Sequence, residues 1–110
     1  MRKELGKIKS ISIGYGGYQD CQFGVFIELG GKGWGVGDCR AYWGRAIQWN
    51  KECKWTEEDR AQAFGEALAW LDDLIIQAKK RNATELVGIP VEVTFDGNML
   101  KSWRILTEVI

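Results

Sequence analysis

Histidine is absent from this 110-residue chain, and proline occurs once, at Pro90. Without histidine the chain cannot form a Ser-His-Asp or Cys-His nucleophile, or a histidine proton shuttle at neutral pH. No apolar run approaches the roughly 20 residues of a membrane span. The charged start, MRKELGKIKS, leads into no apolar signal-peptide core. We therefore expect a cytoplasmic protein without a membrane segment.

Neither sign of charge dominates, since 15 Lys and Arg side chains balance 15 Asp and Glu side chains. This balance argues against duplex DNA as a partner, because such binding depends on neutralising phosphates. Cysteine is scarce, and Cys21, Cys39 and Cys53 form no CxxC pair. With no histidine to complete a Cys/His ligand set, the sequence predicts neither a metal site nor a cofactor.

A chain of this length buries roughly two-thirds of its surface around one core, so residues 1–110 should form a single domain. Alternating apolar residues predict strands over 7–13 and 21–29 and a third that begins at Trp34. Glycine-rich turns separate these strands. Residues 39–55 have no clear period and are expected to be irregular or a short helix.

A helix of roughly 25 residues should follow Thr56, which is a good N-cap with Asp59 three residues later. Lys79 to Arg81 would occupy its last turn and Asn82 would cap its end. The apolar residues at steps of three and four, which predict its buried face, are Phe64, Ala67, Leu68, Leu71, Leu74, Ile75 and Ala78.

The C-terminal part predicts a β-hairpin, with strands over 91–95 and 103–110 and a turn at residues 96–98. The whole chain then reads as an α+β domain of order β-β-β-α-β-β. We expect an antiparallel sheet with the one long helix packed on one face.

Aromatic residues are in surplus, with six tryptophans and three tyrosines. Trp70 and Trp103 should belong to the core. The other large rings lie in glycine-rich or irregular segments that also contain Arg40 and Arg45: Trp34, Tyr42, Trp43, Trp49 and Trp55. Such rings suit stacking on a nucleotide base while arginines hold its phosphates. Equally, they could fill a second small core or a contact between two copies of the chain.

Other signals are weaker. Asp20 and Asp38 each precede a cysteine and could act as an acid/base pair, but solvated turn aspartates are the simpler interpretation, so no catalytic residue is assigned. The candidate ligand-binding residues are Tyr18, Gln19, Trp34, Trp43, Arg45, Asn98 and Arg104. Arg104 should face away from Trp103. The alternative for Arg45 and Arg104 is that each pairs with surface carboxylates such as Glu92 or Glu108.

Four segments together resemble a small protein found widely in bacteriophages and prophages: GYGGYQD (14–20), GGKGWGVGD (30–38), CKWTEEDR (53–60) and VEVTFDGNMLKSWRILTEVI (91–110). The likeness covers nearly the whole chain, and the chain is similar to the first family of Thoeris anti-defence proteins. That resemblance implies a non-catalytic sponge, acting in the infected host, that sequesters a cyclic ADP-ribose-type signal in pockets at oligomer interfaces. It transfers no site residue.

The resemblance therefore implies a small nucleotide signal as partner and a homo-oligomer, a dimer or higher. Two other functions stay open on the residues alone. One is an inhibitor that binds a host defence protein, for example a CRISPR component, through its aromatic surface. The other is an accessory protein that binds single-stranded nucleic acid.

Overall fold

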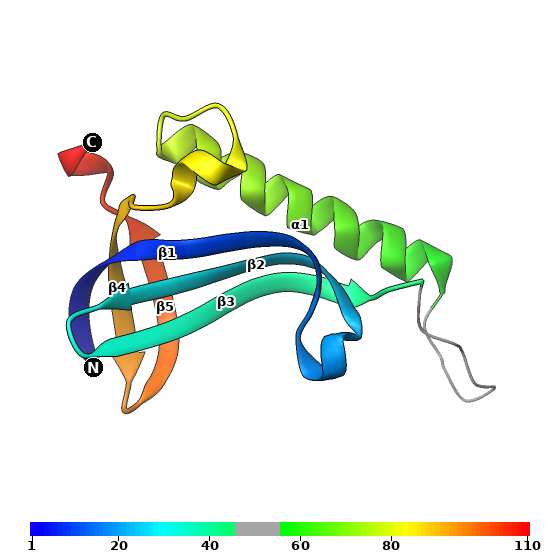
Figure 1. Ribbon diagram of the computed structural model, residues 1–110, viewed down its shortest axis with the longest axis horizontal. Coiled ribbons are helices and arrows are strands. Elements are labelled where there is room, and N and C mark those ends of the chain that lie inside the picture. Colours follow the sequence, from blue (N-terminus) through cyan, green and yellow to red (C-terminus); the bar gives the residue numbers. More distant parts are fainter. Residues whose placement is uncertain (46–55) are drawn as a thin grey trace.

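The computed structural model describes residues 1–45 and 56–110; Trp49, Cys53, Trp55 and the rest of 46–55 lie outside the described residues. The elements follow the predicted order: β1 (Arg2–Gly16), β2 (Gln22–Gly31), β3 (Trp34–Trp43), α1 (Glu57–Gln77), β4 (Pro90–Asp96) and β5 (Met99–Ile105). The strands form one antiparallel sheet, in the order β3-β2-β1-β4-β5, and α1 packs along it (Figure 1). The predicted α+β fold is confirmed.

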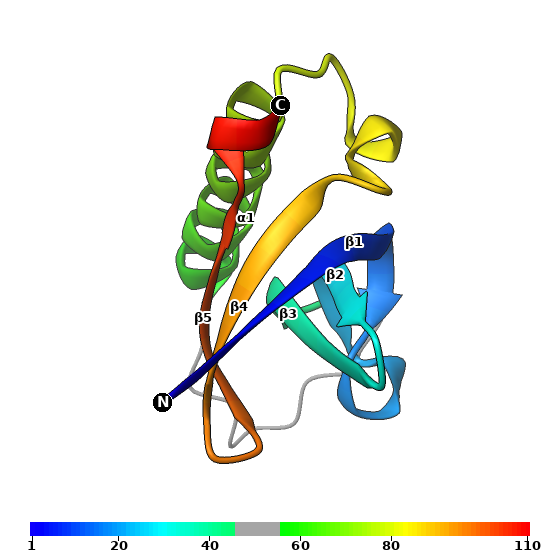
Figure 2. The same ribbon diagram turned by 90° about the vertical axis from the view of Figure 1, so that its left-hand side faces the viewer.

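β1 is shared between two hairpins. Its residues 7–16 pair with β2, and its residues 2–7 pair on the other side with β4. The β4–β5 hairpin consequently crosses the other three strands steeply (Figures 1 and 2). β1 thus begins well before residue 7, where the sequence predicted its start. The charged residues at this end carry no apolar alternation, but their backbones are bonded to β4.

The core lies between the sheet and α1. Val25, Ile27 and Leu29 of β2 and Val91 and Val93 of β4 are almost completely buried. From α1, the buried apolar residues are Ala67, Leu71 and Leu74, with Ala78 just after the helix. The predicted apolar stripe is therefore largely confirmed. Leu68 is the exception, because its side chain remains 60% exposed at the margin of the helix.

α1 begins as predicted. The Thr56 side chain accepts a hydrogen bond from the Asp59 backbone, and the Asp59 carboxylate accepts one from the Thr56 backbone. The helix ends earlier than predicted, because Lys79 adopts a left-handed conformation with φ of 58°. Its N–H bonds to Ile76 O and that of Lys80 to Ile75 O, which is the pattern of a Schellman cap.

Other boundaries also differ from the prediction. Asn82 does not cap α1, and instead precedes the short 3-10 turn η2 (Ala83–Leu86). β3 continues through residues 39–43, which were expected to be irregular or a short helix, because they pair with β2 as far as Gln22. β5 begins at Met99, before the predicted residue 103, because Met99 already pairs with Asp96. It stops at Ile105, since its last partner is Val91 near the start of β4, and the 3-10 turn η3 (Thr107–Val109) follows.

No helix in the described ranges is long and apolar enough to cross a membrane.

Candidate functional site

The predicted site residues occupy four separate places. Trp34 begins β3 and Trp43 ends it, so this strand of 10 residues separates them by roughly 30 Å. Trp34 packs edge-on against Phe95, with ring centroids 5.4 Å apart, and borders the core. Asn98 lies exposed in the β4–β5 turn. A single chain therefore does not gather the predicted set into one pocket.

A second group lies near the end of the sheet where β1 turns into β2. The 3-10 turn η1 (Tyr18–Asp20) contains Gln19 at φ 53°, and the side chain of Tyr18 lies outside what the structure describes. Gln22, just after this turn, pairs with Trp43. Next to Trp43, Arg45 donates to Glu57 at 3.0 Å.

Buried Arg60 joins the start of α1 to the end of β3. Its Nε donates to Trp43 O at 2.9 Å, and its guanidinium also pairs with Glu57. The hydrogen bond from Arg60, with another from Arg45, holds the pKa of the Glu57 carboxyl below its ordinary value. These contacts of Arg60 fix the start of α1 against the end of β3. Arg45, a predicted ligand-binding residue, is paired with the carboxylate of Glu57.

Arg104, like Arg45, forms ion pairs with carboxylate side chains. It faces the side of β5 opposite Trp103, as predicted, and pairs with Glu92 at 3.2 Å and Glu108 at 2.9 Å. Hydrogen bonds to Glu108 and Glu92 raise the pKa of Arg104, and the bond from Arg104 lowers the pKa of Glu108. Both predicted arginines thus pair with carboxylates.

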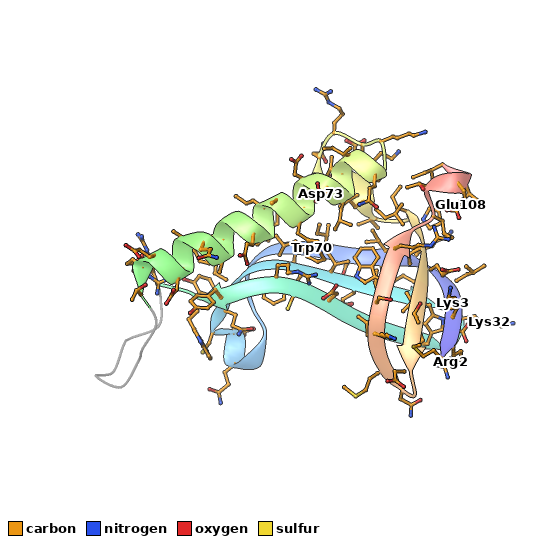
Figure 3. All side chains as sticks on the ribbon, turned by 180° about the vertical axis from the view of Figure 1, so that it is seen from behind. Arg2, Lys3, Lys32, Trp70, Asp73 and Glu108 are labelled. Carbon is orange, nitrogen blue, oxygen red and sulfur yellow. The ribbon has the colours of Figure 1, made fainter. Side chains whose placement is uncertain are left out.

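A groove of about 520 Å³ lies between α1, β3 and β5. Trp70 and Asp73 of α1 line one side, residues 100–105 of β5 line the other, and Asp38 and Arg40 of β3 complete it. Trp70 lies between the helix and the sheet (Figure 3). We call this feature the Trp70–Trp103 groove, because these two rings define it.

At this groove a side-chain hydrogen bond joins the two edge strands of the sheet. Trp103 Nε1 on β5 donates to Asp38 Oδ2 on β3 at 2.7 Å. The other oxygen, Asp38 Oδ1, accepts from Cys39 N at 2.9 Å and from Arg40 Nη1 at 3.0 Å. Because β3 and β5 are the opposite edges of the sheet, this contact shows that the sheet curls under α1.

Trp70 connects the polar and aromatic parts of the groove. The Arg40 guanidinium carbon lies 4.4 Å from the Trp70 ring centroid, a cation–π geometry. The Trp103 ring meets Trp70 edge-on, at 6.4 Å and 81°. The resulting row runs Arg40, Trp70, Trp103, and Asp38 accepts hydrogen bonds from the residues at both of its ends. Such a row can present flat apolar surface and positive charge to the same ligand.

The sequence analysis assigned Trp70 and Trp103 to the core. Both do pack against it, partly buried, and each also lines the groove. Asp38 was expected in a solvated turn, but it lies in β3 and is hydrogen-bonded. Asp20 is exposed in η1, and within the described residues Asp38 bonds to Trp103, Arg40 and the Cys39 amide rather than to Asp20, so these two carboxylates do not form a pair.

No local signal marks the groove, because Asp38 and Trp103 are 65 residues apart in the sequence. The groove combines two indole rings with a guanidinium, and such a combination can accommodate a flat ring and an anionic group. In the part of the chain that the structure describes, no group of three His, Cys, Asp or Glu side chains could hold a metal ion.

Comparisons with protein-family models, curated proteins and solved structures found no match for this chain.

Proposed function

We propose that the protein binds a nucleotide in the Trp70–Trp103 groove and holds it without chemical change. The volume of about 520 Å³ is within the range of small-molecule sites. Following the sequence resemblance, the proposed ligand is a cyclic ADP-ribose-type signal, and the proposed setting is the cytoplasm of a bacterium infected by a phage. The protein would act as a sponge that lowers the free concentration of that signal.

The row of Arg40, Trp70 and Trp103 is the observation that carries this proposal. An indole offers a base a stacking surface, which contributes about 1–3 kcal/mol per base. The Arg40 guanidinium bonds to Asp38 and to the Cys39 carbonyl through Nη1, and its Nε and Nη2 can bind phosphate through two parallel hydrogen bonds. The Asp38 hydrogen bonds hold both ends of the row before a ligand arrives, which reduces the entropy lost on binding.

The same contacts favour binding over catalysis. A general base needs a free lone pair directed at the proton it removes. Of the two carboxylates that line the groove, Asp38 uses its oxygens for Trp103, Arg40 and its neighbouring backbone amide, and Asp73 is exposed on the surface of α1. The sequence offers no histidine to take that role. We therefore propose that bound nucleotide leaves the groove unaltered.

Calorimetric titration with cyclic ADP-ribose isomers, ADP-ribose and adenosine tests the proposal. Arg40→Ala should weaken binding of the phosphorylated ligands ten- to a hundredfold, which corresponds to about 1.5–3 kcal/mol for a hydrogen bond to an anion. Arg81→Ala is the matched control, since Arg81 is exposed beyond the helix and should leave affinity unchanged. Chromatography should recover the ligand intact.

Absence of binding by all three ligands, or equal losses in Arg40→Ala and Arg81→Ala, would contradict the site. Time-dependent conversion of the ligand would contradict the sponge. A parallel titration with a single-stranded oligonucleotide at increasing salt addresses the nucleic-acid alternative, because that affinity should fall steeply as salt rises.

A further inference from the structure

Part of β1 is an open edge within the described residues. β4 pairs with β1 only as far as Lys7, whereas β2 pairs with it as far as Gly16. Residues 10–14 therefore have a strand on one side alone, and Figure 1 shows no strand beyond them. We call residues 10–14 the β1 edge.

The backbone of the β1 edge is oriented for pairing. Ile27 O and Leu29 O point toward β3, since they lie 3.6 and 3.7 Å from the positions that a Cβ would occupy on Gly37 and Gly35. In an antiparallel sheet, a residue that bonds to one neighbour presents no N–H or C=O to the other. Ile11 lies opposite Ile27. Because Ile27 bonds to β3, it makes no backbone hydrogen bond to Ile11. The N–H and C=O of Ile11 therefore point away from β2.

Ile13 repeats this orientation, because it follows Ile11 by two residues and lies opposite Val25. Its side chain is 54% exposed. α1 packs over β3 and β2 rather than over this part of β1. The β1 edge thus offers outward-pointing backbone groups together with an uncovered apolar side chain.

Beside the β1 edge, α1 contributes a second exposed apolar residue, Leu68, which is 60% exposed. A hollow of about 130 Å³ separates Leu68 from Ile13, and Phe23, Phe64 and Ala67 also line it. A strand added to the β1 edge would place alternate side chains over this hollow. Exposed apolar surface next to an open strand edge is the usual form of a β-pairing interface.

We propose that the β1 edge pairs antiparallel with the β1 edge of a second copy of this chain. The sequence of the edge, Ser-Ile-Ser-Ile-Gly, carries no charge, so two copies meet without repulsion. Antiparallel pairing about a two-fold axis keeps Ile11 and Ile13 of both copies on one face, and both α1 helices lie on that same face. Ile13 of each copy then covers the hollow beside Leu68 of the other.

This interface is separate from the Trp70–Trp103 groove. Trp70 and Asp73 lie on the side of α1 that faces β3 and β5, whereas Leu68 lies on the side that faces β1. The dimer therefore leaves the groove open, and the inference does not depend on the proposed function. Nucleotide affinity that is equal in dimeric and monomeric variants would show this independence directly.

Sedimentation velocity over a wide concentration range tests the dimer. The unaltered protein should reach twice its monomer mass, and Ile13→Lys should raise the dimer dissociation constant at least tenfold, because it places two ammonium groups at the two-fold interface. Ile76→Lys is the matched control: its side chain, on the same helix as Leu68, is 65% exposed outside the hollow. It should dimerise like the unaltered protein, and circular dichroism should show both variants folded.

Amide hydrogen exchange by NMR locates the interface independently. The amides of Ile11 and Ile13 should exchange more slowly as concentration rises, whereas Ser12, whose N–H points to β2, should change little. A protein that stays monomeric at every concentration would overturn the proposal. So would a dimer that tolerates Ile13→Lys, or one in which exchange at Ile11 and Ile13 does not slow.

Discussion

The hydrogen bond between Trp103 and Asp38 should couple the two edges of the sheet energetically. A hydrogen bond to a charged group contributes about 1.5–3 kcal/mol to stability. The Asp38 side chain remains 24% exposed, so water can replace the lost donor in part. We therefore expect a coupling energy at or just below the lower limit of that range, about 1–1.5 kcal/mol.

A double-mutant cycle of Trp103→Phe and Asp38→Ala isolates this term, because phenylalanine keeps an aromatic ring and lacks the N–H. Urea unfolding of the four proteins gives each free energy from the midpoint at a constant slope. A second cycle with Asp73→Ala is the control, since Asp73 borders the same groove and, within the described residues, makes no hydrogen bond to Trp103. Coupling below about 0.5 kcal/mol in the Asp38 cycle, the range of independent sites, would refute the reasoning.

Three other predictions concern the fold. Leu71→Ala should cost about 2–5 kcal/mol in urea unfolding, because Leu71 is buried, whereas Leu68→Ala should cost less than about 1 kcal/mol. Arg60→Ala should cost about 1.5–3 kcal/mol in the same assay, since it removes the bond to the Trp43 carbonyl. Arg104 lowers the pKa of Glu108 in the folded state, so their pairing stabilises the protein above the unfolded pKa of Glu108. Glu108→Gln should therefore lower the melting temperature slightly at pH 7, and melting curves should converge as the pH falls through the folded pKa; a difference that persists in acid would contradict this pairing.

The sequence predicted the elements whose signals are local. Thr56 and Asp59 mark the start of α1, and both hydrogen bonds of their capping box form. The end of α1 escaped prediction, because Lys79 takes the left-handed position where glycine is usual. A lysine at that position has no sequence signature, so the basic run after it was assigned to the helix.

The candidate site was harder to predict, because it depends on how the sheet curls. Trp103 and Asp38 lie on opposite edges of the sheet. Only the curvature of the sheet brings Trp103 Nε1 within 2.7 Å of Asp38 Oδ2. The sequence did identify the useful side chains, since an aromatic surplus beside Arg40 suggested base stacking. It favoured Trp34 and Trp43 over Trp70, because glycine-rich segments predict loops, and here those segments form long strands.

Mass spectrometry of the protein incubated with cyclic ADP-ribose isomers tests the central claim most directly. The complex is freed of unbound ligand, then heated to release what it holds. The proposed function predicts that one intact isomer is recovered from the unaltered protein and from Arg81→Ala, and that Arg40→Ala retains far less. Recovery of no isomer, of a hydrolysed product, or of equal amounts from Arg40→Ala would contradict the account.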